Sequence, residues 1–142
     1  MSISIRPATA DDIEALMALD TYLPIDPERA TEIHEWVTAG GCVIAEVGGQ
    51  PSGYAAIGRF FRQPMIEILM VAEPHRRSGV GRALLRLLCA GCEAPRIWTS
   101  TNQSNLPMQS LLLSEGFVFA GALEGLSVND PERFYYKSLA RR

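Results

Sequence analysis

The sequence predicts a single α/β domain of seven strands and about four helices. The 142 residues are 47% hydrophobic and contain no linker, repeat or low-complexity stretch, which fits one domain (residues 1–142) around a buried core. Period-two and helical hydrophobic patterns follow one another in the order β-α-α-β-β-β-α-β-α-β-β. Such an order predicts helices packed on a β-sheet.

The first forty residues predict one strand and two helices. Ile3 and Ile5 alternate with polar residues, as in a half-buried strand. Thr9 can cap a first helix, whose first turn is acidic. After a loop over residues 21–27, a second helix is expected from about Pro27 to the glycines at 40–41. The inward positions of these two helices are Ile13, Leu16, Met17 and Leu19, then Ile33, Trp36 and Val37.

The remaining elements follow from turn signals and hydrophobic runs. Strands 42–47 and 52–61 are joined through Gly48-Gly49, a hairpin signal. A third strand of this region spans 65–72, and a helix is expected over 79–93. Strand 96–101 comes next, and Ser104 or Asn105 can cap a helix over 107–114. Residues 117–122 and 133–139 predict the last two strands.

The junction before helix 79–93 predicts a site for a pyrophosphate group. A helix N-terminus exposes unpaired N–H groups where aligned peptide dipoles favour anions. Gly79 and Gly81 leave room for a phosphate beside the backbone, and Arg76, Arg77 and Arg82 add positive charge. Neither a Walker loop nor a G-x-G-x-x-G fingerprint is present. The alternative is an ordinary glycine-rich connection with solvated arginines.

Two motifs resemble the GNAT acetyltransferase superfamily. Arg76-x-x-Gly79-x-Gly81 resembles its R/Q-x-x-G-x-G/A signature. Downstream and in register, Asn105-x-x-Met108-x-x-x-Leu112-x-x-x-Gly116-Phe117 resembles N-x-x-A-x-x-x-Y-x-x-x-G-F. The resemblance covers roughly residues 3 to 138. It implies a mixed seven-stranded sheet that splays between the fourth and fifth strands, with acetyl-CoA as cosubstrate in that gap.

The resemblance also implies which residues bind the cofactor. The main chain of Leu69, Met70 and Val71 would contact the pantetheine arm, and backbone N–H groups there would polarise the thioester carbonyl. Asn105 would lie beside the cofactor on the helix that follows it. The pyrophosphate would be bound by the loop and helix start: Arg76, Arg77, Ser78, Gly79, Val80, Gly81 and Arg82.

Glu67 is the candidate catalytic base. It is the one ionisable residue in the strand Met65-Ile-Glu-Ile-Leu-Met-Val71, where burial would disfavour the charged carboxylate and tune it as a proton acceptor. The alternative is a solvated Glu67, or one paired with Arg59 or Arg62. The general acid stays unassigned, because Leu112 occupies the place of the family tyrosine and is expected to face the cofactor cleft. The other hydroxyl candidates are Tyr22, Tyr54, Tyr135, Tyr136, Ser110 and Ser114.

The predicted activity is transfer of the acetyl group to a primary amine of a small molecule or amino-acid-like acceptor. The acceptor site is expected between loop 21–28 and the segment joining the last two strands, both biased towards acidic residues. One alternative is a non-catalytic module that binds or senses acyl-CoA, since Leu112 cannot donate a proton. Another is acetylation of a protein N-terminus or lysine.

Composition restricts the partners. A net charge of −3 argues against nucleic-acid binding. Neither a signal peptide nor a membrane span is predicted, and Cys42, Cys89 and Cys92 are expected to be reduced, buried thiols without a metal role. A cytoplasmic location is therefore expected, with a homodimer left open.

Overall fold

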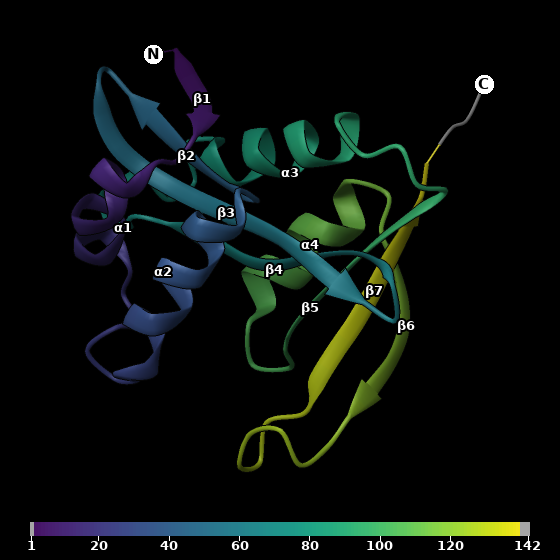
Figure 1. Cartoon of the computed structure of the whole chain (residues 1–142). Coiled ribbons are helices and arrows are strands. Elements are labelled where there is room, and N and C mark those ends of the chain that lie inside the picture. Colours follow the sequence, from purple (N-terminus) through teal and green to yellow (C-terminus); the bar gives the residue numbers. More distant parts are fainter. Residues whose placement is uncertain (1, 140–142) are drawn as a thin grey trace.

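The computed structural model describes residues 2–139 and contains one seven-stranded mixed sheet (Figure 1). The strand order is β1-β2-β3-β4-β5-β7-β6, and only the β4–β5 pair is parallel. The strands are β1 Ile3–Pro7, β2 Cys42–Val47, β3 Gln50–Phe60, β4 Gln63–Val71, β5 Arg96–Asn102, β6 Val118–Leu123 and β7 Glu132–Ser138. The predicted fold class and element order are confirmed.

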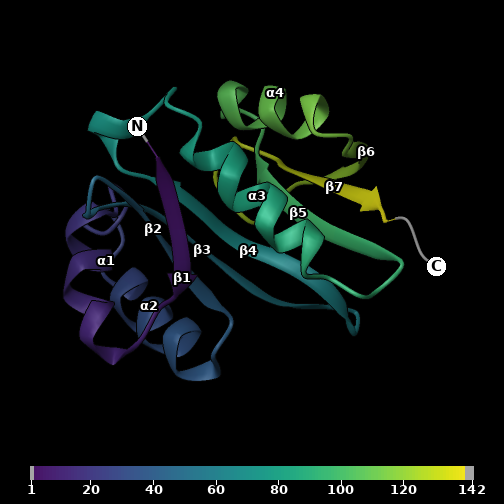
Figure 2. The ribbon, with the colours of Figure 1, turned by 90° about the horizontal axis from the view of Figure 1, so that it is seen from above.

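Four α-helices and two short 3₁₀ turns connect the strands within this part of the chain. They are η1 Ala10–Asp12, α1 Ile13–Leu19, α2 Glu28–Ala39, η2 Glu73–His75, α3 Val80–Ala90 and α4 Leu106–Ser114. Viewed from above, α1 and α2 cover one face of the sheet, and α3 and α4 cover the other (Figure 2). The helix expected over 79–93 ends earlier, because Gly91 follows Ala90.

The sheet separates two apolar clusters. One lies under α3 and α4 and includes Leu84, Leu85, Ile97, Leu112 and Phe117. The other lies under α1 and α2 and includes Leu16, Ile33 and Tyr54. The β2–β3 hairpin turns at Gly48 and Gly49, whose φ angles of 58° and 80° are left-handed, as a tight two-residue hairpin requires.

β4 is irregular on both of its edges. Opposite β3 the register shifts, so that Ala56 pairs with Ile68 and Ile57 with Ile66. Glu67 lies between these pairs and has no partner on β3, which is a β-bulge. On its other edge, β4 pairs with β5 only at Met65 and Ile66. Beyond Ile66 the two strands diverge, which confirms the predicted splay.

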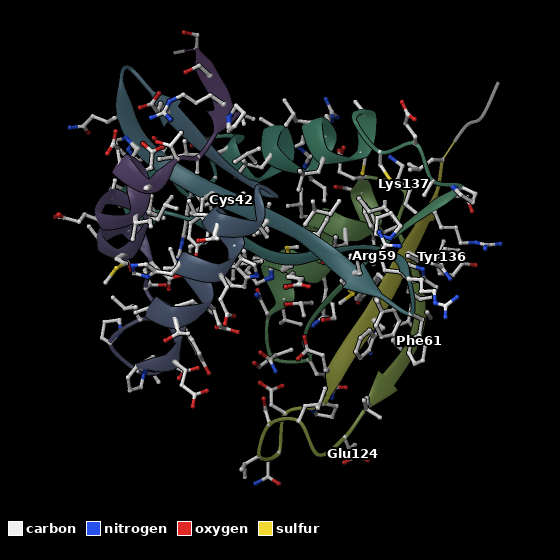
Figure 3. The ribbon with its side chains drawn as sticks, in the orientation of Figure 1. Cys42, Arg59, Phe61, Glu124, Tyr136 and Lys137 are labelled. Carbon is white, nitrogen blue, oxygen red and sulfur yellow. The ribbon has the colours of Figure 1, made fainter. Side chains whose placement is uncertain are left out.

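On the α1/α2 side of the sheet, a patch of aromatic side chains lies where no described helix covers the strands. The Phe60 ring stacks on Phe134, with centroids 5.4 Å apart, and lies 5.5 Å from Trp98. Phe61 at the β3–β4 turn is 84% exposed. Arg59, Phe61 and Tyr136 are seen together at this end of the sheet in Figure 3. This patch lies apart from the cleft between β4 and β5, because none of these residues lines that cleft.

Candidate active site

A cleft of about 1150 Å³ opens where β4 and β5 diverge. Its walls come from β4, β5, the start of α3 and one face of α4. The volume exceeds that of most drug-sized ligand sites, about 300–1000 Å³, so a ligand larger than a typical drug molecule fits. The cleft has two chemically different ends, one rich in arginine and one containing carboxylates.

The arginine end is built around the N-terminus of α3. Gly79 is the N-cap with φ of 90°, and Arg77 is also left-handed at 65°. Left-handed residues in such a loop turn successive N–H groups to one side, which makes an anion-binding concavity. The Arg76 Nε donates to the Val71 carbonyl at 3.2 Å, and its terminal nitrogen donates to Thr21 Oγ1 at 3.2 Å. The loop conformation therefore suits a phosphate group.

The Arg82 side chain is held by Glu115, the C-cap residue of α4. Glu115, whose side chain is only 7% exposed, accepts hydrogen bonds from Arg82 and from Arg86 Nε, the latter at 2.8 Å. The hydrogen bonds from Arg86 and Arg82 lower the pKa of Glu115 to about 2. Glu115 thus remains charged and orients Arg82 at the edge of the cleft.

Most of the predicted cofactor residues line the cleft. They are Leu69, Met70, Val71, Arg76, Arg77, Gly79, Gly81, Arg82 and Asn105. Ser78 and Val80 are not among the lining residues: the Ser78 hydroxyl donates to the His75 carbonyl, and Val80 is buried in the core. The Val80 side chain is therefore not available to a ligand in the cleft. Asn105 Oδ1 accepts from Met108 N at 3.2 Å, so Asn105 is also the predicted helix cap.

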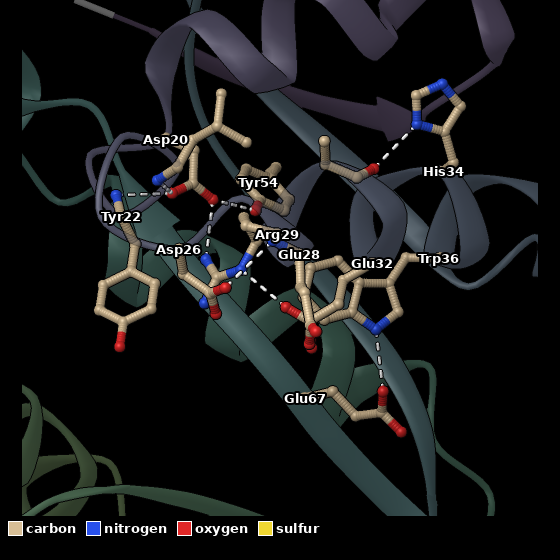
Figure 4. Close-up of polar contacts among 12 residues, drawn as sticks. Asp20, Tyr22, Asp26, Glu28, Arg29, Glu32, His34, Trp36, Tyr54 and Glu67 are labelled. Atoms are coloured by element: carbon tan, nitrogen blue, oxygen red, sulfur yellow. Dashed lines mark hydrogen bonds and ion pairs between the residues drawn. The ribbon is translucent and has the colours of Figure 1, made fainter. Parts of the chain in front are cut away.

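Glu67 lies at the other end of the cleft, with different surroundings from those expected. Its carboxylate is exposed, so the predicted burial is wrong: the bulge turns the side chain out of the apolar pattern of β4. Oε1 accepts a hydrogen bond from Trp36 Nε1 at 2.8 Å (Figure 4). Arg59 instead donates to the Arg62 carbonyl at 2.7 Å. The structure shows no ion pair from either arginine to Glu67.

Leu112 does not face the cleft. It is 0% exposed and packs in the cluster with Leu85 and Phe117. The expectation that it points at the cofactor is wrong, because adjacent helix positions differ by about 100° and the neighbouring Leu111 takes the cleft-facing place. The α4 residues that line the cleft are Pro107, Met108, Ser110, Leu111 and Ser114.

Among the tyrosines of residues 2–139, Tyr22 alone lines the cleft, and it is 45% exposed. Tyr135 is buried, and its hydroxyl accepts from Arg133 Nε at 3.0 Å. Tyr54 is buried as well and donates to Asp20. Burial raises the pKa of the Tyr54 phenol, and the bond to Asp20 raises it further. Tyr54 is therefore poorly suited to donate a proton to a substrate.

A buried polar network supports the acidic end, and sequence reasoning missed it. Asp20 accepts from Tyr54 and from Arg29 at 2.8 Å, and from the N–H groups of Tyr22 and Leu23 at 2.8 and 3.1 Å (Figure 4). Arg29 also donates to Glu32 at 3.0 Å. The charge of Arg29 is thus compensated twice. No local pattern could reveal this network, because Asp20 and Tyr54 are 34 residues apart.

Polar residues at the end of β5 and in the turn that follows contact the β6–β7 side of the sheet, and several of them line the cleft. Ser100 Oγ and Asn102 Nδ2 donate to Glu132 of β7 at 2.8 and 3.1 Å, and all three residues line the cleft. Ser104 Oγ donates to Asp130 at 2.6 Å, which links the turn before α4 to the segment between β6 and β7. Of the acidic residues predicted for the acceptor side, only Glu132 lines this cleft.

Other sequence expectations concern thiols, metals and membranes. All three cysteines are free; Cys42 is buried, whereas Cys89 and Cys92 are only half-buried. Burial raises the pKa of the Cys42 thiol to about 11. Within residues 2–139, no group of three or more His, Cys, Asp or Glu side chains is arranged to bind a metal. None of the helices described is long and apolar enough to cross a membrane.

Comparisons with known proteins agree with this geometry. The acetyltransferase (GNAT) family model matches residues 10–117. A GNAT family acetyltransferase from Bacillus cereus superposes with a TM-score of 0.91 at 27% identity, over 99% of this chain and 100% of that one. A ribosomal-protein-alanine N-acetyltransferase from Brucella melitensis gives 0.80 at 26% identity, over 96% and 99% of the two chains.

A third structure shares the fold at lower identity. It is described as a streptothricin acetyltransferase from Bacillus anthracis in complex with acetyl coenzyme A, and it matches with a TM-score of 0.80 at 18% identity, over 99% of this chain and 100% of that one. A comparison with curated protein sequences found no match.

Proposed function

Because the chain belongs to the GNAT acetyltransferase family, we propose that it transfers the acetyl group of acetyl-CoA to a primary amine of a small molecule or amino-acid-like acceptor. One observation carries this proposal. A single cleft joins an arginine-rich helix N-terminus at one end to the Glu67 carboxylate at the other. Phosphates and an ammonium group are the ligands that those two ends favour.

The cofactor half of the cleft fits acetyl-CoA. The left-handed loop at Arg77 and Gly79 presents N–H groups, and three arginines surround it. Past Ile66, the edge of β4 has no β5 partner, so the main chain of Leu69, Met70 and Val71 is available to pair with pantetheine amides. Backbone N–H groups near Met70 and Val71 would polarise the thioester carbonyl.

The acceptor amine must lose a proton before it attacks. Glu67 would accept that proton, directly or through a water molecule. The amine nitrogen then bonds to the thioester carbonyl carbon, the carbon–sulfur bond breaks to release the CoA thiolate, and the nitrogen loses its second proton to that thiolate or to water. Tyr22 and Ser110 offer hydroxyl groups on the cleft surface, but a thiolate can also leave without a proton donor near neutral pH. The general acid therefore remains unassigned.

The charges at the acceptor end favour a cationic acceptor. Arg29 is compensated by Asp20 and Glu32, so within residues 2–139 the cleft carboxylates without an ion pair are those of Glu67 and Glu132. A protein N-terminus is a second candidate acceptor, and the similarity to the Brucella ribosomal-protein-alanine acetyltransferase favours it. Both acceptors present a primary amine to the same carboxylate.

The test is release of CoA thiol from acetyl-CoA across a panel of amines, amino acids and peptides with free N-termini. We expect turnover with at least one small amine. The Glu67→Gln variant should lower kcat/KM by roughly 10²-fold, the usual contribution of a positioned base. Tight binding of acetyl-CoA with no thiol release for any acceptor would instead favour a non-catalytic binding module. Selective turnover of peptides would favour protein acetylation.

A further inference from the structure

Two residues outside the family motifs lie against the Glu67 carboxylate. Oε1 accepts the indole N–H of Trp36 at 2.8 Å (Figure 4). Oε2 lies directly over Gly58 of β3, so close that a Cβ at Gly58 would be 1.9 Å from it. We infer that Trp36 and Gly58 are positioning residues that hold Glu67 ready for proton transfer. This inference rests on the proposed role of Glu67 as the base.

Glu67 needs such support because the bulge leaves it without local restraint. It has no partner on β3 and is exposed to the cleft, and a glutamate side chain that is fixed in place loses about 1.5–2 kcal/mol of conformational entropy. Among residues 2–139, the Trp36 indole provides the side-chain hydrogen bond to this carboxylate. A base must keep hydrogen-bond distance to the proton that it removes.

Trp36 is itself held by the buried network. Its ring lies 6.3 Å from the Tyr54 ring, and the Arg29 guanidinium lies 5.7 Å from the Trp36 ring. Tyr54 and Arg29 both donate hydrogen bonds to Asp20, whose side chain is completely buried. The orientation of the indole, and through it that of Glu67, is therefore set by groups that are not free to move.

Gly58 provides the space on the other side. A methyl group there would lie 2.4 Å from Glu67 Cδ, well inside van der Waals contact. The atoms that it would meet are the end of a flexible side chain, so Gly58→Ala should displace the carboxylate while leaving the fold intact. It changes the position of the base without changing its chemistry.

A double-mutant cycle on kcat/KM tests the inference. Trp36→Phe keeps an aromatic ring and removes the N–H donor, and we expect about a tenfold loss, near the value of one hydrogen bond to a charged group. In the Glu67→Gln background the same change should cost less than about twofold, since coupled residues are not additive. Gly58→Ala should likewise lose about tenfold with Glu67 present and nothing in a Glu67→Ala background. KM for acetyl-CoA should not change.

Equal losses from Trp36→Phe in both backgrounds would overturn the inference, because the tryptophan would then be merely structural. Full activity of Trp36→Phe and Gly58→Ala would overturn it as well. Wild-type activity of Glu67→Gln would instead refute the proposed base, and the positioning role with it.

A second measurement needs no activity. The indole N–H resonance of Trp36 should shift strongly in Glu67→Ala, while that of Trp98, which donates to Gln63 at 2.7 Å, stays in place. An unmoved Trp36 resonance would show that the hydrogen bond is absent in solution.

Discussion

Replacing Leu112 with tyrosine, the residue that the family motif carries there, should destabilise this protein rather than activate it. Leu112 is 0% exposed and packs in the cluster with Leu85 and Phe117. Forcing a larger side chain into a packed core costs about 1–3 kcal/mol. A buried hydroxyl without a partner costs about 1–3 kcal/mol more. The expected loss is therefore about 2–6 kcal/mol, a large part of the total stability of a domain.

Urea denaturation, extrapolated linearly to water, measures this loss. Leu112→Met is the matched control, since a swap of similar volume should cost less than about 1.5 kcal/mol. Leu111→Tyr is the positional control: Leu111 lines the cleft, so the new ring can extend into open space with a smaller loss. A Leu112→Tyr variant as stable as wild type, with faster acetyl transfer, would refute the assignment of this position to the core.

Three further predictions test other parts of the structure. Gly81→Val should weaken acetyl-CoA binding by roughly tenfold or more in calorimetry, about 1.4 kcal/mol. Gly81→Ala should bind normally, because a Cβ there comes no closer to Leu111 than 3.4 Å. Unchanged affinity in a folded Val variant would exclude the phosphate site. Tyr54→Phe removes a donor from Asp20 and should lower the free energy of unfolding by about 1–3 kcal/mol in urea, and no loss would mean that the network contributes nothing. The pKa of Glu115 is lowered from 4.5 to about 2, so its ion pairs stabilise the fold above pH 4.5 and are lost as the pH falls towards 2. Glu115→Gln should therefore make Tm less dependent on pH between 4.5 and 2, and an unchanged dependence of Tm on pH would contradict this.

The sequence by itself determined the order of the elements and the residues that form the arginine-rich end of the cleft. These are local properties. Gly48-Gly49 specifies a hairpin wherever it joins two strands, and Gly79 followed by an amphipathic helix specifies an exposed helix N-terminus. Nine of the cofactor residues predicted from the loop pattern and from the family resemblance line one cleft.

Only the tertiary structure decided the surroundings of the candidate base. The apolar pattern of β4 suggested that Glu67 is buried, but a register shift against β3 turns it into the cleft. Its partner Trp36 is 31 residues away, and Gly58 matters only because the bulge brings the carboxylate over it. Pairing register depends on the whole sheet, so no pattern within one strand could reveal these contacts.

Leu112 shows that a sequence motif on a helix does not reveal which way a side chain faces. The motif places it correctly in the chain, and its spacing from Asn105 and Gly116 matches the family pattern. Which side of α4 faces the cleft depends on how the helix is rotated against the sheet. That rotation is set by the apolar cluster with Leu85 and Phe117, because burying Leu112 there removes its whole side chain from water. Packing across the fold, which spacing along the chain does not encode, therefore decided that Leu112 belongs to the core.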